Sequence, residues 1–189
     1  MAVKKTIPEL KHLDHVLVSE TAIRKRIKVL AEKINRTYRG EDLTVIAIVN
    51  GALIFAADLL RQLRTPLRLD CLRATSYHAG TEAGGKPVII DNLKLDISGQ
   101  QVLLVDDILD TGNTLTAVRQ LLLAKGAASV RTCVLLDKKA RRSVTFDAEY
   151  VGFDIPDEFV VGYGLDFNER YRNLPCIGVL KPKHYAGKK

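Results

Sequence analysis

One short stretch limits the possible folds more than any other: an apolar run that ends in acids and is followed by a segment with helical periodicity. Residues 102–105 (Val-Leu-Leu-Val) come shortly after a turn residue, Gly99. A continuous apolar run bounded in this way predicts a strand buried on both faces of a parallel sheet. Apolar residues then recur at helical spacing from Leu115 to Leu122, and Gly126 is placed to end the helix. The stretch therefore predicts an α/β protein.

The connection between this strand and this helix carries a dense set of polar residues. Asp106 and Asp107 follow the apolar run, and Asp110-Thr111-Gly112-Asn113-Thr114 precedes the helix. Small hydroxyl and glycine residues before a helix expose backbone N–H groups, which together with threonine hydroxyls suit a phosphate monoester. The paired carboxylates would repel that phosphate, so they fit vicinal sugar hydroxyls or a bound Mg²⁺ beside it. The combination favours a ribose 5-phosphate ligand.

A second interpretation is that these acids and threonines only cap the helix. For any single residue here, capping is the simpler explanation. The polar residues crowd one strand end, however, and open α/β sheets bind their ligands at the carboxyl ends of their strands. We therefore favour a ligand site.

The run from Val102 to Leu115 resembles the phosphoribosyl-pyrophosphate motif of type I phosphoribosyltransferases. Both have four apolar residues, two acids, two spacers, an aspartate, then Thr-Gly and a further threonine. The resemblance implies a mostly parallel twisted sheet flanked by helices, with a small hood and a mobile lid loop. It also implies that Asp110 is the general acid/base that handles a purine proton. The residues implied to bind phosphoribosyl pyrophosphate are Asp106, Asp107, Thr111, Gly112, Asn113 and Thr114.

Two other stretches match further parts of this family. Residues 44–49 predict a buried strand and residues 52–63 a helix. The family places a pyrophosphate loop between them, here Asn50-Gly51, often with a non-proline cis peptide. Residues 74–86 are rich in small polar residues and glycine, which is typical of a loop. A surface hairpin would look the same, but Ser76 and Tyr77 match the Ser-Tyr pair of the family's lid.

The base-binding residues are implied by the last part of the chain. Residues 129–136 predict another buried strand, and Lys138 follows it, within a charge run that would otherwise indicate a solvated loop. Val151–Pro175 resembles the purine hood of the 6-oxopurine (hypoxanthine/guanine) phosphoribosyltransferases. By that resemblance Lys138 contacts the exocyclic oxygen, Phe159 stacks on the base, the Val160 backbone meets its edge, Asp166 holds Mg²⁺ near the base and Arg172 contacts pyrophosphate.

Length and composition limit the remaining classes. At 189 residues the chain suits one domain, residues 1–189. The resemblance implies a hood from N-terminal residues and about 150–182 and a lid at about 74–87. No apolar run approaches the roughly 20 residues of a membrane span. The N-terminus lacks the apolar region of a signal peptide, so we expect a cytoplasmic protein without a membrane partner. The formal net charge of +7 allows nucleic-acid binding, but the acids interleaved with Lys and Arg favour small polyanionic ligands instead.

The sequence thus predicts a purine-salvage enzyme. It would transfer 5-phosphoribosyl from phosphoribosyl pyrophosphate (PRPP) to N9 of hypoxanthine or guanine, giving IMP or GMP and pyrophosphate. The family implies Mg²⁺, held by Asp106, Asp107 and Asp166, and a homodimer or homotetramer. The alternatives are a regulator of the same fold that binds RNA or DNA, a receiver-type phosphoacceptor domain, and the same transfer to xanthine or adenine. The receiver interpretation leaves Thr111–Thr114 and the region of Phe159 unexplained.

Overall fold

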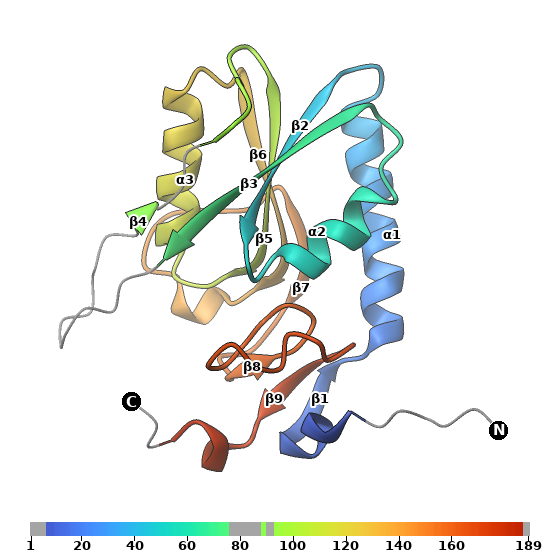
Figure 1. Cartoon of the computed structure of the whole chain (residues 1–189), viewed down its shortest axis with the longest axis vertical. Helices are drawn as coiled ribbons and strands as arrows, with labels where there is room; N and C mark the ends of the chain where they lie inside the picture. Colours follow the sequence, from blue (N-terminus) through green and yellow to red (C-terminus); the bar gives the residue numbers. More distant parts are fainter. Residues whose placement is uncertain (1–6, 76–87, 90–92, 187–189) are drawn as a thin grey trace.

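The computed structural model describes residues 7–75, 88–89 and 93–186 and divides their strands between a large and a small sheet (Figure 1). The large sheet has the strand order β4-β3-β2-β5-β6-β7. Its strands are β2 (Leu43–Val49), β3 (Leu67–Thr75), β4 (Val88–Ile89), β5 (Gln101–Leu109), β6 (Ser129–Asp137) and β7 (Tyr150–Asp154). All neighbours are parallel except β4, which runs antiparallel to β3. The predicted α/β class with a mostly parallel sheet is confirmed.

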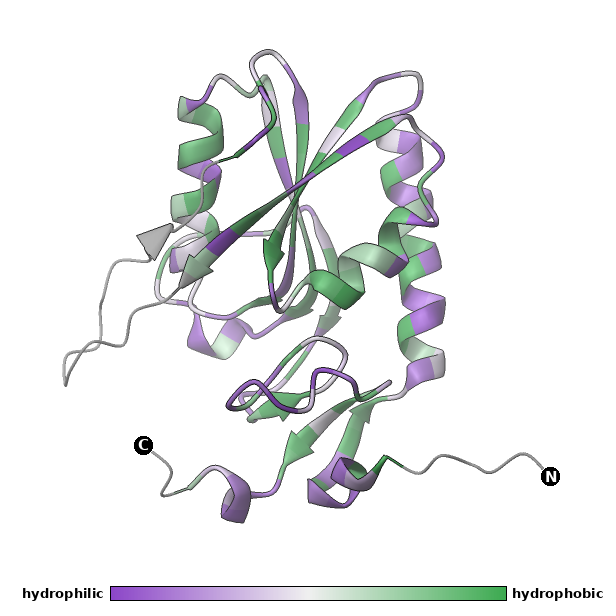
Figure 2. Ribbon diagram, viewed as in Figure 1, coloured by the Kyte–Doolittle hydropathy of each residue, from purple (hydrophilic) through white to green (hydrophobic). Residues whose placement is uncertain are grey.

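Helices cover both faces of the large sheet. α3 (Asn113–Ala124) lies on one face, and α1 (Glu20–Thr37) and α2 (Leu53–Leu60) lie on the other (Figure 1). α1 begins at Ser19, whose hydroxyl accepts a hydrogen bond from the Ala22 N–H at 3.2 Å and so satisfies a first-turn donor. The buried residues of α1 recur every three or four positions, which turns its apolar stripe toward the sheet and its charged residues outward (Figure 2).

The central strand β5 is buried on both faces, as its apolar run predicts. Leu103 and Val105 pack in the core beneath α1 and α2, whereas Val102 and Leu104 pack in the core beneath α3. Successive side chains of a strand point to opposite faces, so a strand covered on both sides needs apolar residues at every position. This explains why the stretch is continuously apolar rather than alternating.

β5 extends further than the apolar run indicates. β6 pairs with it as far as Leu109 and Asp137, so Asp106 and Asp107 lie within the ladder and not after its end. The predicted helix at 52–63 is shorter, ending at Leu60. No helix in the described ranges is long and apolar enough to cross a membrane.

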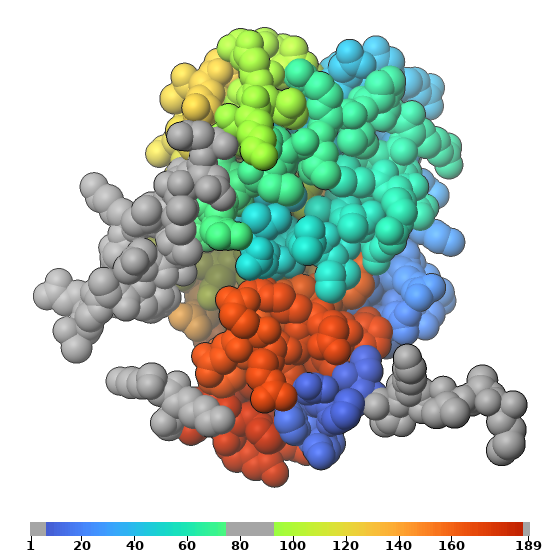
Figure 3. Space-filling model, viewed as in Figure 1, coloured from blue at the N-terminus to red at the C-terminus, as the bar shows by residue number. Residues whose placement is uncertain are grey.

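We refer to the small sheet, with the segments that join its strands, as the hood. It is antiparallel, with the order β1-β9-β8, and its strands are β1 (Leu13–Val18), β8 (Val160–Val161) and β9 (Ile177–Leu180). Short 3-10 helices flank it: η1 (Pro8–His12) and η3 (Pro182–His184), while η2 (Lys139–Arg141) follows β6. In Figure 3 the orange hood residues lie directly against the cyan segment that contains α2.

The hood begins later than the predicted boundary near residue 150. Tyr150–Asp154 forms β7 and pairs with β6 in the large sheet. Tyr150 is buried in the core beneath α1, and its hydroxyl donates to Thr37 Oγ1 at 2.9 Å, which anchors this segment to the end of α1. The chain therefore enters the hood only after Asp154.

Candidate active site

A cavity of about 420 Å³ opens where β2 and β5 end, between the large sheet and the hood. Because parallel strands end at the same edge of a sheet, residues far apart in the sequence meet here. The predicted site residues on its wall are Asn50, Gly51, Asp106, Asp107, Asp110, Thr111, Gly112, Thr114, Asp166 and Arg172.

Gly112 allows the chain to turn from β5 into α3. It is the N-cap residue and has a φ of 88°, in the left-handed region that favours glycine. A Cβ at this position would lie 2.9 Å from Val144 Cγ2, so the segment after η2 closes the outer side of the turn. The first-turn N–H groups of α3 have no carbonyl partner within the helix and lie beside Thr111 and Thr114 at the cavity wall. This arrangement suits an anion.

Asp106 and Asp107 place two carboxylates together at the cavity. Asp106 is buried, and its Oδ1 accepts a hydrogen bond from the Asp107 N–H at 2.9 Å. Burial, reinforced by the neighbouring Asp107 charge, raises the pKa of Asp106 well above its usual range. Burial also raises the pKa of Asp107, although the hydrogen bond with Asp106 and the Arg172 charge act in the opposite direction. A cation or hydroxyl donors would stabilise this pair.

The Asn50-Gly51 loop is enclosed on both sides. The peptide bond between Val49 and Asn50 is cis. A Cβ at Gly51 would lie 2.0 Å from Asp107 Oδ2, and a Cβ at Gly164 of the hood would lie 2.2 Å from the Gly51 carbonyl oxygen. Glycine is thus required at both positions because the loop, the acid pair and the hood approach so closely.

Arg172 brings a positive charge from the hood to the cavity. Its Nη1 donates to the Gly164 carbonyl at 2.8 Å, and its Nη2 lies 2.9 Å from Asp166 Oδ1 and 2.8 Å from Glu169 Oε2. Asp166 Oδ2 also accepts the Glu169 N–H at 2.9 Å. Both residues are therefore held in place by hood contacts at the wall.

Asp110 presents a carboxylate that the protein leaves largely unpaired. Arg141 Nε lies 3.4 Å from Asp110 Oδ1, within ion-pair distance. This oxygen is nevertheless buried and has no hydrogen-bond partner within the described part of the chain. The geometry of the pair is too loose for a hydrogen bond, so Arg141 meets this oxygen as an ion-pair neighbour and not as a hydrogen-bond donor.

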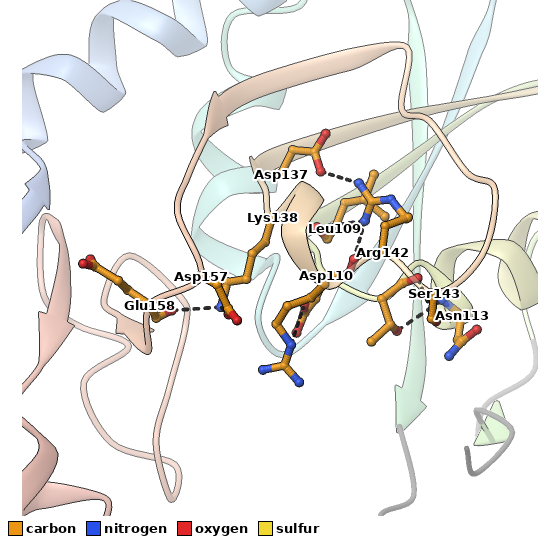
Figure 4. A network of polar contacts seen from close by, with 11 residues as sticks. Leu109, Asp110, Asn113, Asp137, Lys138, Arg142, Ser143, Asp157 and Glu158 are labelled. Carbon is orange, nitrogen blue, oxygen red and sulfur yellow. Dashed lines mark hydrogen bonds and ion pairs between the residues drawn. The ribbon is translucent and has the colours of Figure 1, made fainter. Parts of the chain in front are cut away.

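Of the predicted base-binding residues, Asp166 is on the cavity wall, whereas Lys138, Phe159 and Val160 are not. Lys138 is 5% exposed, which corrects the interpretation of its charge run as a solvated loop. Its Nζ donates to the Glu158 carbonyl at 2.8 Å and lies 3.7 Å from Asp157 Oδ1 (Figure 4). The amino group is thus bonded to the hood segment and does not project into the crevice beside Asp106.

Phe159 is an exposed aromatic residue in this part of the hood. Its side chain stacks on Tyr185 with ring centroids 4.7 Å apart and meets the edge of Phe167 at 5.6 Å. Its neighbour Val160 is buried in β8. Tyr185 directly follows η3, near the end of the described residues, so this C-terminal segment packs against the hood at Phe159.

The predicted lid residues Ser76 and Tyr77 lie outside the described residues. Asn113 begins α3 but is not on the cavity wall. Conversely, sequence reasoning missed Arg141, which lines the cavity, and Arg142, which lies behind it. The signal for both was the charge run that follows β6.

The acid pair fits a magnesium ion. Mg²⁺ is commonly held by one or two carboxylates, with substrate phosphates and water as the other ligands. Asp106 and Asp107 supply oxygen ligands whose mutual repulsion a cation would relieve. No group of three or more metal-ligating side chains occurs among residues 7–75, 88–89 and 93–186.

A second hollow, of about 500 Å³, lies at the opposite edge of the sheet. Arg36, Arg39 and Arg64 line it together with Gly40 and Pro66, which precede β2 and β3. It is at the amino ends of the strands, where open α/β sheets do not bind their ligands. The cavity beside the acid pair is therefore the candidate active site.

Comparison with known proteins identifies the family. The model of the phosphoribosyl transferase domain matches residues 17–168. The hypoxanthine-guanine phosphoribosyltransferase of Staphylococcus aureus (strain Mu50) is 43% identical over 174 residues, which cover 92% of this chain and 97% of that protein. The bifunctional protein TilS/HprT of Listeria innocua is 42% identical over 174 residues, but the chain spans only 27% of its length.

A solved structure extends the similarity to the fold. The crystal structure of a hypoxanthine phosphoribosyltransferase from Staphylococcus aureus superimposes with a TM-score of 0.92 and 41% sequence identity, covering 97% of this chain and 100% of that one. The match includes the motif at Val102–Leu115 and most of the hood. The chain therefore belongs to the phosphoribosyltransferase family and, within it, to the type I hypoxanthine phosphoribosyltransferases.

Proposed function

We propose that this chain transfers the 5-phosphoribosyl group of PRPP to N9 of hypoxanthine or guanine. In this reaction the C1–O bond to pyrophosphate breaks, the C1–N9 bond forms and the purine loses a proton. The observation that carries the proposal is the cavity beneath the hood, where the acid pair, the start of α3 and Arg172 surround one volume. Its chemistry matches a ligand with a phosphate at one end and a leaving pyrophosphate at the other.

The residues act by positioning and electrostatics. Loss of pyrophosphate builds positive charge on the ribose ring, as in glycoside cleavage. Asp106 and Asp107 lie where their negative charge favours that cation, and Arg172 with the Asn50-Gly51 backbone binds the departing anion. The Thr111–Thr114 segment holds the 5-phosphate at the start of α3.

The proposal includes a Mg²⁺ ion bound at the active site. Asp106 and Asp107, on the cavity wall, would hold the ion near the ribose, and Asp166 would hold an ion directly or through water. When bound, the ion neutralises charge on the pyrophosphate oxygens.

Base recognition falls to Lys138, Phe159 and Val160. The Lys138 amino group can donate a hydrogen bond to a 6-oxo group but not to a 6-amino group. Sites built on such donors discriminate sharply between the two kinds of base. We expect its amino group to move from the Glu158 carbonyl to the purine oxygen when the base binds. The exposed Phe159 offers an aromatic face on which a base can stack.

One assay tests the activity. The protein is incubated with PRPP, Mg²⁺ and, in turn, hypoxanthine, guanine, xanthine or adenine, and nucleotide formation is followed by absorbance. Transfer to hypoxanthine or guanine is the expected result. Transfer to none of the four bases would contradict the proposal and favour the regulator, which an RNA titration at varied salt would then reveal by its steep salt slope.

Replacing Asp110 tests its role as general acid/base. In this role its carboxylate takes up the purine N7 proton while N9 attacks C1 of the ribose. Asp110→Asn keeps the shape of the side chain but cannot exchange that proton. We expect kcat to fall by about 10²–10⁴, the usual range for general acid/base catalysis. PRPP binding, measured by calorimetry, should stay close to wild type. Turnover near the wild-type value would remove Asp110 from the mechanism.

We further propose that the protein is cytoplasmic and acts as a homodimer or homotetramer. Large apolar side chains are exposed on α1, α2 and β3, including Val29, Leu53 and Leu69, and they offer area for contacts between copies. Light scattering coupled to size exclusion would measure the mass, and a monomer would contradict this part.

A further inference from the structure

Arg142 lies behind the cavity wall and contacts both of the strands whose ends carry the proposed catalytic and base-binding residues (Figure 4). Its Nη1 donates to the Leu109 carbonyl at 3.2 Å and to the Asp110 carbonyl. Its Nη2 donates to Asp137 Oδ1, which completes a buried ion pair. The Arg142 side chain is 16% exposed and that of Asp137 is 4% exposed, so solvent screens this pair little.

The segment after β6 satisfies the carbonyls at the end of β5 one after another. The Leu109 carbonyl also accepts the Lys138 N–H at 2.9 Å. The Thr111 carbonyl accepts the Ser143 N–H at 3.0 Å and the Ser143 hydroxyl at 3.2 Å. Arg142 supplies the donor for the Asp110 carbonyl that lies between them. The backbone that carries Asp110 is thus held through its carbonyls, which leaves the carboxylate for a ligand.

The other end of the guanidinium is fixed to the base-binding side of the site. Asp137 directly precedes Lys138, and its carbonyl accepts the Ile155 N–H at 2.9 Å where the chain enters the hood. A planar guanidinium can reach these separate acceptors at once, whereas a lysine ammonium is a single point donor. Arg142 therefore spans the distance between the Asp110 backbone and the residue next to Lys138.

We propose that Arg142 is a positioning residue for the transfer reaction, and this inference rests on the proposed function. It fixes the backbone of Asp110 relative to Lys138, so that the acid/base carboxylate and the base keep one geometry. Arg142 does not line the cavity, and its action on the reaction passes through Asp110. A misplacement of about 1 Å between reacting groups costs about 100-fold in rate, which sets the size of the expected effect.

Two variants and a control measure this role. Arg142→Met removes the charge and all the donors, and Arg142→Lys keeps a charge for Asp137 but loses the fork to the carbonyls. Lys139→Met is the matched control, because Lys139 lies in the same segment but is exposed, and its Nζ pairs with the exposed Asp154. We expect kcat to fall about 100-fold for Arg142→Met, to a lesser extent for Arg142→Lys, and to stay unchanged for Lys139→Met. The KM for PRPP should change less than kcat.

A double variant separates positioning from a general loss of structure. If Arg142 acts through Asp110, the kcat of Asp110→Asn combined with Arg142→Lys will equal that of Asp110→Asn alone. Losses that multiply, or wild-type kcat in Arg142→Lys and Arg142→Met, would overturn the proposal. If Arg142→Met does not fold, Arg142→Lys carries the test because it keeps the buried charge paired. A wild-type protein inactive on every base would instead refute the proposed function, and the positioning role with it.

Discussion

Gly51→Ala tests how closely the pyrophosphate loop, the acid pair and the hood must approach. The new Cβ would lie 2.0 Å from Asp107 Oδ2, 2.6 Å from its Cγ and 3.1 Å from its Oδ1. Ordinary contacts between such atoms are about 3.5 Å, so rotating the carboxylate cannot relieve the overlap and more than about 1 Å of movement is needed. The loop cannot withdraw, because the Gly51 carbonyl packs against the backbone of Gly164 on its other side.

The size of the effect follows from this geometry. Overpacking of a well-packed site costs about 1–3 kcal/mol. In a chain of this length each kcal/mol lowers the melting temperature by about 2–4 °C. A shift of about 1 Å in Asp107 or in the loop would also lower kcat/KM for PRPP by about 100-fold.

Thermal unfolding followed by circular dichroism and initial rates at varied PRPP measure the two effects. Gly40→Ala is the control, since Gly40 has a φ of 79° but no atom within 4 Å of its Cβ position. That variant bears only backbone strain of about 1–2 kcal/mol, far from the cavity, and should keep wild-type kinetics. The reasoning is refuted if Gly51→Ala keeps wild-type kcat/KM for PRPP.

Three further changes test other contacts. Tyr163→Phe removes the hydrogen bond that the Tyr163 hydroxyl donates to Asp58 of α2, and should cost about 0.5–1.5 kcal/mol in urea unfolding. Burial, with help from Asp58, raises the pKa of Tyr163, so the wild type should lose stability as pH rises above the ordinary tyrosine pKa of about 10 while the Phe variant loses less. Burial alone would raise the pKa of Asp70, but hydrogen bonds from the backbone N–H groups of Cys71, Lys94 and Leu95 lower it. Asp70→Ala should therefore cost about 1 kcal/mol at neutral pH in chemical denaturation, a difference that closes as pH falls below the ordinary carboxyl pKa of about 3.9. Lys138→Gln should reduce the kcat/KM ratio of hypoxanthine to adenine, because the amide can serve as donor or acceptor; an unchanged ratio would place 6-oxo recognition elsewhere.

Local patterns were enough to predict the large sheet and the edge at which the site lies. Val102–Val105 is apolar at each position because both faces of β5 are covered, and the stripe of α1 follows from one buried face. Parallel strands then bring residues that follow β2 and β5 to one edge without further information. The meeting of Gly51 with Asp107 across the cavity is the direct result.

Contacts that depend on distant carbonyls were not predictable in this way. The charge run at residues 137–142 looks solvated because all of its residues except Ala140 are charged, yet Asp137 and Lys138 are buried. Their burial follows from partners that other segments supply, such as the Glu158 carbonyl for Lys138. The same holds for Tyr185, whose stacking on Phe159 depends on where the hood turns the end of the chain.

The way β5 and β6 end explains how the segment after β6 can position both Asp110, proposed for proton transfer, and Lys138, proposed to bind the base. The strands pair up to Leu109 and Asp137, so the residues that follow them, Asp110 and Lys138, start from a common and rigid base. Beyond that point the two segments diverge, one into α3 and the other toward the hood, and the hydrogen bonds of the β-ladder no longer join them. Arg142 bonds to the chain on both sides of this division. An ion pair placed there keeps the phosphoribosyl end and the base end in register while leaving the facing side chains to the ligands, which is why its loss should lower kcat more than it weakens binding.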